Sequence, residues 1–231
     1  MQPPNGALVL ALDTTHEIGS VALLRRAGGG TEILEEVEIH APTGFAHVLY
    51  PHLSRLLDRH GVALDSLDAF AAASGPGSFT GIRVGLACIK GLAEATGRPA
   101  IGVSNLQALA TFGSARLRAV VMDARRGDIY GGLYNSQNQP VAPEVVAKLP
   151  AWLATLPDCP LEFVSSNFEP FRGFLSGTRF EETPTVTAGP LLAAAIGKLA
   201  LARLEAGERP DPAALDANYV RRSDAELFWK E

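Results

Sequence analysis

The stretch Phe70-Ala-Ala-Ala-Ser-Gly-Pro-Gly-Ser-Phe-Thr-Gly-Ile-Arg-Val-Gly85, continued to Gly97, decides the predicted fold. Its apolar start, Phe70–Ala73, is typical of a buried strand. A glycine-containing loop follows, and either Ser78 or Thr80 is the expected N-cap of a long helix. Gly97 is expected just beyond the end of that helix, where a left-handed residue is common. A strand, a tight loop and a helix in this order predict an α/β fold.

The predicted helix carries two faces without polar side chains. Gly81, Gly85 and Cys88 fall close to one line, whereas Ile82 and Leu86 belong to a second, bulkier face. A surface helix needs only one apolar stripe. We therefore expect the small-residue face to contact a partner. The alternative, in which both faces pack inside the chain, stays open.

The loop before this helix does not match the common phosphate-binding motifs. A P-loop needs a lysine after its last glycine, but Ile82 follows Gly81. The dinucleotide fingerprint needs a third glycine where Thr80 stands, and Pro76 removes one N–H donor. These departures favour a structural strand-to-helix turn.

The composition limits the class of protein. Of 231 residues, 47% are hydrophobic, which allows a sizeable core, and the net charge of −5 argues against unaided nucleic-acid binding. Only Cys88 and Cys159 are present, so no disulfide framework is predicted. Neither a signal peptide nor a membrane-spanning apolar run is recognised, and we expect a cytoplasmic protein.

The N-terminal part reads as three strands. Leu8–Leu12 ends on Asp13, the chain returns at 19–24, and 32–39 forms the third strand. Asp13 and the hydroxyls of Thr14 and Thr15 could hold a metal-bound phosphate or close an Asx turn. The residues alone favour the turn.

A helix is expected over Thr43–His60, with a kink or a break at Pro51. His47 and His52 are five positions apart, which turns them away from a shared helix face, so they are not expected to bind a metal. Leucines recur at helical spacing, among them Leu49, Leu53 and Leu56.

The pattern then begins again. Arg118–Asp123 repeats the apolar run that ends in aspartate, and Gly127–Tyr134 repeats the return strand, which indicates an internal duplication. We expect an N-terminal subdomain at 1–113, a partly degenerate C-terminal subdomain at 114–222, and a tail at 223–231. The C-terminal expectations are short helices over Pro143–Leu149 and Phe168–Leu175, a strand over Leu161–Val164, and a helix over Ala188–Glu205.

These motifs together resemble the TsaB (YeaZ) family. The resemblance rests on the strand–Asp–Thr-Thr hairpin, on Ser-Gly-Pro-Gly-Ser-Phe-Thr-Gly, on Ile-Gly-Val-Ser, and on Asp-Ala-Arg-Arg-Gly-Asp-Ile-Tyr. It covers Leu8 to Tyr134 well and then thins. It implies a duplicated actin/Hsp70/sugar-kinase-like (RNase H-like) α/β fold of two subdomains.

The resemblance also implies a function. The family is the partner subunit in making N6-threonylcarbamoyladenosine at adenosine 37 of tRNAs that read codons beginning with A. The catalytic relative TsaD carries a His-x3-His metal pair, whose matching positions here are Asn105 and Leu109. Leucine cannot ligate a metal, and asparagine supplies only a weak neutral oxygen. We therefore expect a non-catalytic chain with no catalytic, metal or cofactor residues.

The expected partners are a TsaD-like catalytic subunit, a TsaE-like ATPase and, only indirectly, tRNA; no membrane is involved. The sequence leaves open whether the isolated chain is a monomer or forms a homodimer through the same surface. A stand-alone sugar-kinase-like phosphotransferase or ATPase is the alternative function. A peptidase gains no support, because Ser78 has no histidine near it in sequence. The residues expected to bind the partner are Leu49, Leu53, Leu56, Gly81, Gly85, Cys88 and Leu92.

Overall fold

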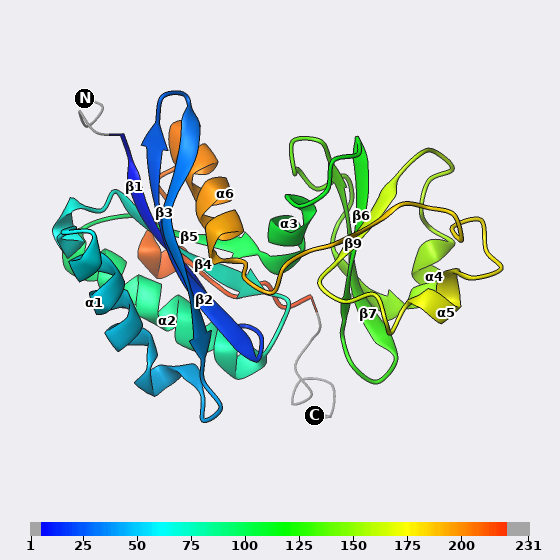
Figure 1. The fold of residues 1–231 in the computed structure, drawn as a ribbon, viewed down its shortest axis with the longest axis horizontal. Helices are drawn as coiled ribbons and strands as arrows, with labels where there is room; N and C mark the ends of the chain where they lie inside the picture. Colours follow the sequence, from blue (N-terminus) through cyan, green and yellow to red (C-terminus); the bar gives the residue numbers. More distant parts are fainter. Residues whose placement is uncertain (1–5, 221–231) are drawn as a thin grey trace. The chain divides into compact units, whose positions relative to one another are not determined.

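The structure, a computed structural model, describes residues 6–220 (Figure 1). The chain forms two units. The first contains the described chain up to Asn105 together with Leu191–Asn218, and the second contains Leu106–Pro190 with Tyr219 and Val220. Within the described residues, no helix is long and apolar enough to cross a membrane.

The first unit is built on a five-stranded sheet in the order β3-β2-β1-β4-β5. Strands β1, β2 and β3 form an antiparallel meander, and β4 and β5 continue the sheet in parallel with β1. Strands β1 and β4 are almost entirely buried, which explains why both read as continuous apolar runs. The strands are β1 (Leu8–Asp13), β2 (Ile18–Ala27), β3 (Gly30–His40), β4 (Ala69–Gly75) and β5 (Ala100–Ser104).

Helices cover both faces of this sheet. Figure 1 shows α1 (Leu49–Arg59) and α2 (Phe79–Thr96) on one side and α6 (Ala193–Glu205) on the other. Short 3-10 helices lie at Phe45–His47, Leu64–Ser66 and Pro212–Ala214. The N-terminus of α6 is capped from the sheet. The Ser20 hydroxyl accepts from the N–H of Ala193 at 3.0 Å, and the Glu36 carboxylate accepts from the N–H of Ala194 at 2.8 Å.

The two helix ends predicted for α2 are confirmed. Ser78 is the N-cap, and its hydroxyl accepts a hydrogen bond from the N–H of Gly81 at 3.2 Å. Gly97 ends the helix with a left-handed φ of 64°. In the preceding segment the break lies at Val48, so Pro51 falls within the first turn of α1, where a proline removes no helical hydrogen bond.

The second unit repeats the sheet of the first. Its order is β10-β9-β6-β7-β8, with β6, β7 and β8 antiparallel and β9 and β10 parallel to β6. Read from β8 to β10, the order and directions match those of β3 to β5. The predicted duplicated, RNase H-like α/β fold is confirmed. The strands are β6 (Leu117–Asp123), β7 (Asp128–Asn135), β8 (Val145–Lys148), β9 (Glu162–Ser165) and β10 (Thr185–Thr187).

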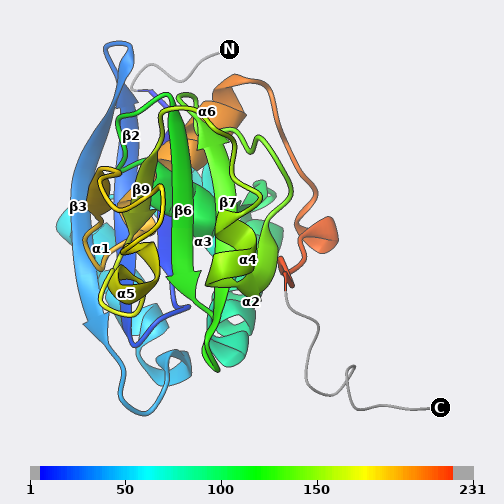
Figure 2. The same cartoon turned by 90° about the vertical axis from the view of Figure 1, so that its right-hand side faces the viewer.

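Small helices complete the second unit. They are α3 (Asn105–Ala110), α4 (Leu149–Leu153) and α5 (Arg172–Leu175), and Figure 2 shows α4 and α5 in front of the sheet. The core between α4, α5 and the sheet contains several aromatic side chains. Among them, Phe163 and Phe180 form an edge-to-face pair whose ring centroids lie 5.4 Å apart. Such a pair stabilises the core beyond its buried area by about 1 kcal/mol.

Three expectations for the C-terminal half differ from the structure. Most of Pro143–Leu149, expected as a helix, forms the edge strand β8, and β10 was not predicted. The helix expected over Ala188–Glu205 begins at Ala193 and packs on β1 and β2 of the first unit. The units therefore divide after Asn105 and again after Pro190, not at 113, because the apolar face of α6 covers the first sheet. The predicted tail at 223–231 lies outside the described residues.

Candidate functional site

The turn between β1 and β2 is closed by its own side chains. One carboxylate oxygen of Asp13 accepts from the backbone N–H of Thr15 at 2.8 Å and from its hydroxyl at 2.6 Å. The other lies 3.4 Å from Nδ1 of His16. Asp13, Thr14 and Thr15 are each no more than 2% exposed. The Asx turn that the residues favoured is confirmed.

Asp13 and His16 shift each other's titration. Burial opposes the charge on Asp13, but its hydrogen bond and charge attraction to His16, with the bonds from Thr15, lower its pKa overall. Burial likewise opposes the charge on His16, but the bond and charge of Asp13 raise the pKa of His16 overall. Glu36 lies near Asp13, and burial raises its pKa. The contact therefore favours an ionised Asp13 beside a protonated His16.

Helix α2 and its leading loop press against this turn. The hydroxyl of Thr14 donates to the carbonyl of Gly81 at 2.7 Å, and the N–H of Ser78 donates to the carbonyl of Thr15 at 2.8 Å. A β-carbon at Gly77 would lie 2.7 Å from the β-carbon of Thr15, and one at Gly81 would overlap the carbonyl oxygen of Thr14. The glycines thus allow close packing of two loops, and Thr15 occupies the space beside Gly77.

Asn105 joins the same network from the start of α3. Its amide donates to the Thr15 hydroxyl at 2.7 Å, and its oxygen accepts from the N–H of Gly75 at 3.1 Å. Leu109, at the second matched metal position, is 1% exposed. Among residues 6–220, no group of three or more His, Cys, Asp or Glu side chains is placed to hold a metal ion.

The polar groups of the β1–β2 turn already have hydrogen-bond partners within the chain and are not available to a ligand. The carboxylate of Asp13 and the hydroxyls of Thr14 and Thr15 are each engaged by neighbouring groups of the chain. Buried polar groups that hydrogen-bond to one another stabilise a loop, and breaking such a bond to bind a ligand costs free energy. The hydroxyl of Ser78 is engaged as the helix cap described above.

The residues expected to bind a partner lie mostly inside the chain. Gly85 packs so closely on β1 that an added β-carbon would lie 2.6 Å from the Thr14 hydroxyl and 3.0 Å from Cδ1 of Leu12. The small-residue face of α2 is therefore covered by the β1–β2 turn. Only Leu92 is partly exposed, and the buried members are Leu49, Leu53, Leu56, Gly81, Gly85 and Cys88.

The exposed surface of the same two helices consists of other residues. Tyr50 on α1 is 54% exposed and contacts the Cys88 thiol, and Phe79 at the start of α2 is 43% exposed. The guanidinium of Arg83 lies 3.8 Å from the centre of the Phe79 ring. Arg83, Ala87 and Gly91, spaced by four, are all exposed. We call Tyr50, Phe79, Arg83, Ala87 and Gly91 the α1–α2 surface.

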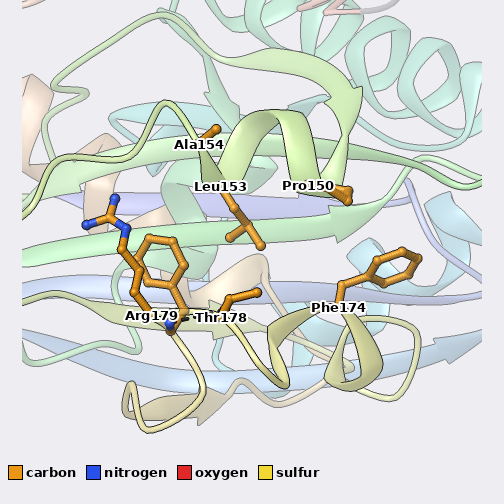
Figure 3. A pocket seen from close by; sticks show the side chains of 7 residues that line it. Pro150, Leu153, Ala154, Phe174, Thr178 and Arg179 are labelled. Atoms are coloured by element: carbon orange, nitrogen blue, oxygen red, sulfur yellow. Dashed lines mark hydrogen bonds between the residues drawn. The ribbon is translucent and has the colours of Figure 1, made fainter.

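A shallow cavity of about 240 Å³ lies in the second unit, between α4 and the segment that runs from α5 to Phe180 (Figure 3). The guanidinium of Arg179 pairs with Asp158 at 3.0 Å and lies 4.3 Å from the centre of the Phe180 ring. The lining holds no carboxylate, histidine or thiol, and its one hydroxyl, that of Thr178, donates to the carbonyl of Leu175 at 2.6 Å, so no general base is present to activate a nucleophile. It consists of Pro150, Leu153, Ala154, Phe174, Thr178, Arg179 and Phe180.

Comparison with known proteins identifies the family. A family model described as TsaD, tRNA N6-adenosine threonylcarbamoyltransferase, matches residues 38–166. The chain is 30% identical to the tRNA threonylcarbamoyladenosine biosynthesis protein TsaB of Bacillus subtilis, over 96% of this chain and 98% of that protein. The chain belongs to the TsaB family. The TsaB of Haemophilus influenzae is 38% identical over 53% of this chain and 51% of its own length.

The fold comparison agrees. The structure of YeaZ from Pseudomonas aeruginosa superposes with a TM-score of 0.76 at 28% identity, covering 92% of this chain and 99% of that one. The TsaB resemblance read from the motifs is thereby confirmed. Sequence reasoning missed the exposed Tyr50 and Phe79. Helical periodicity could not have found Phe79, because it stands three positions before Ile82 and seven before Leu86, on the side of the helix that carries those buried residues.

Proposed function

We propose that this chain is a non-catalytic subunit in the formation of N6-threonylcarbamoyladenosine at adenosine 37 of tRNA. It acts by binding and organising a TsaD-like catalytic subunit. The observation that carries the proposal is the closed network around Asp13, Thr15 and Asn105, in which the groups suited to phosphate or metal binding already bind one another. The names of its relatives supply the pathway.

The network argues against the phosphotransferase alternative. A kinase of this fold needs a carboxylate and backbone donors that face bound phosphates. Here the Asp13 carboxylate is 1% exposed, and the Thr15 side chain occupies the space at Gly77. Releasing these groups for a ligand would leave buried polar atoms without partners, at about 1–3 kcal/mol for each.

The α1–α2 surface is the contact that we propose for the catalytic subunit. Exposed aromatic and arginine side chains such as Tyr50, Phe79 and Arg83 are enriched in protein interfaces. Ala87 and Gly91 leave room for another helix to approach closely. The same surface suits a homodimer of the isolated chain, and the TsaE-like ATPase would join the assembled pair.

The test is reconstitution of the modification with unmodified tRNA, threonylcarbamoyl-adenylate as the donor of the transferred group, Mg-ATP, the catalytic subunit and the ATPase. We expect product only when this chain is supplied together with the catalytic subunit. Equal product without this chain would refute the proposed function, and steady hydrolysis of Mg-ATP by the purified chain would favour the phosphotransferase.

Two matched variants test the surface. Ala87→Trp places a bulky side chain on the α1–α2 surface, and Ala202→Trp places one at an exposed position of α6. We expect Ala87→Trp to abolish co-elution with the catalytic subunit and Ala202→Trp to leave it intact, with both variants folded. Normal co-elution of Ala87→Trp would place the interface elsewhere without refuting the function.

A further inference from the structure

The turn between β6 and β7 has an unusual backbone for its residues. Arg125, Arg126 and Gly127 all have positive φ, at 63°, 55° and 74°. Glycine adopts this left-handed region freely, and asparagine and aspartate tolerate it, but for an arginine it costs about 1 kcal/mol. Hairpin turns of this kind favour Asn-Gly. Folding alone therefore does not explain two successive arginines here.

Neighbouring side chains hold the turn in this conformation. The carboxylate of Asp123 accepts from the N–H of Arg125 at 2.8 Å. The ammonium group of Lys148, at the end of β8, donates to the carbonyl of Arg126 at 3.0 Å and pairs with Asp128 at 2.8 Å. The N–H of Asp128 also donates to the carbonyl of Arg125 at 3.0 Å. The turn is thus fixed by β6, β7 and β8 together.

The duplication provides an internal comparison. Asp13 in the first hairpin and Asp123 in the second each accept from the N–H two residues later, at 2.8 Å in both cases. In the first hairpin this motif is buried and its side chains bind one another. In the second, Asp123, Arg125 and Arg126 are exposed. The equivalent aspartate motif is therefore buried in one unit and exposed to solvent in the other.

The charges of the turn suit an anion. The Asp123 carboxylate accepts from the backbone N–H of Arg125, and the Asp128 carboxylate pairs with Lys148. Both carboxylates therefore stabilise the turn. Within the described residues, the guanidinium of Arg125 makes no hydrogen bond or ion pair. Arginine matches phosphate oxygens with two parallel N–H donors, and a rigid backbone reduces the entropy lost on binding.

We propose that the Arg125–Arg126 turn contacts phosphate groups of the tRNA backbone, which gives this chain a direct contact with the RNA. The proposal rests on the proposed function for the identity of the RNA. The net charge of −5 excludes a broad basic footprint, so the contact is local and adds to the binding of the assembled complex. It revises the expectation that tRNA is met only indirectly.

The test replaces both arginines with asparagine. Asparagine tolerates positive φ, so Arg125→Asn with Arg126→Asn removes two charges while the turn is kept or stabilised. The control is Arg25→Gln with Arg59→Gln, which removes the same number of positive charges elsewhere on the chain. In the parent, Arg25 pairs with Glu32 and Arg59 pairs with Glu35. Binding of an unmodified tRNA transcript is measured by fluorescence anisotropy across a salt series, for the assembled complex and for the chain alone.

We expect the asparagine variant of the complex to bind tRNA about tenfold or more weakly at about 0.1 M salt. Its plot of log affinity against log salt should be shallower by about 0.9 for each phosphate contact that is lost. The control should match the parent. Unchanged affinity and slope, for complex and chain alike, would refute the contact.

Two other outcomes would also overturn it. Loss of co-elution with the catalytic subunit in the asparagine variant would assign the turn to a protein contact. Weaker binding of free ATP with unchanged tRNA binding would assign it to a nucleotide. If the asparagine variant assembles, supports modification and binds tRNA with unchanged affinity, this inference is refuted and the proposed function stands.

Discussion

Gly85→Ala tests whether the small-residue face of α2 is an internal contact. The added β-carbon would lie 2.6 Å from the Thr14 hydroxyl and 3.0 Å from Cδ1 of Leu12, so these atoms must move by several tenths of an ångström. Overpacking by one methyl group costs about 2 kcal/mol. Disturbing the hydrogen bond from Thr14 to Gly81 costs about 1 kcal/mol. The higher helix propensity of alanine returns about 1 kcal/mol.

The expected net loss is about 2 kcal/mol of unfolding free energy, or a Tm lower by about 4–8 °C. Gly91→Ala is the matched control, because Gly91 lies in the same helix with open space at its β-carbon. That variant should gain about 1 kcal/mol from helix propensity alone. Urea and thermal unfolding measure both. If Gly85→Ala were as stable as Gly91→Ala, the β1–β2 turn would not cover this face, and the partner role of Gly85 would regain support.

Two further predictions concern titratable groups. The Asp13–His16 pair stabilises the fold most between about pH 4 and 6.5. The pKa of Asp13 is lowered, so its contribution to stability is lost when the carboxylate is protonated as the pH falls. The pKa of His16 is raised, so its contribution is lost when the imidazole is deprotonated as the pH rises. His16→Asn should flatten this pH dependence of Tm, and an unchanged profile would contradict the pairing. Burial raises the pKa of the Cys88 thiol to about 11, whereas Cys159 is exposed. A thiol-reactive disulfide reagent should label Cys159 at once and Cys88 only on unfolding, so rapid labelling of both would be inconsistent with the buried position.

The first half of the fold could be predicted because its signals are local. An apolar run predicts a strand, Ser78 caps α2, and Gly97 ends it, whatever the rest of the chain does. In the second half, strand β8 is a four-residue edge strand, too short to show a period. Its valines favoured a strand, but the flanking prolines and the short window concealed it.

The candidate surface could be predicted only in part, because periodicity shows which residues share a face and not what covers it. Gly81 and Gly85 do share one face of α2, as expected, but the turn that covers it comes from Thr14, far away in sequence. The leucines of α1 likewise mark the side turned to the sheet. A contact surface therefore has to be sought among the polar and aromatic residues that the apolar pattern leaves over.

The position of α6 bears on how the chain folds during synthesis. Strands β1 and β2 leave the ribosome early, but the helix that covers one side of them is translated only after the whole second unit. The bond between Ser20 and Ala193 spans 173 residues, and Gly197 fits directly against Leu24. At about 5–20 residues per second, the nascent first sheet keeps an apolar side uncovered for roughly ten seconds or more. During that interval we expect it to depend on ribosome-associated chaperones.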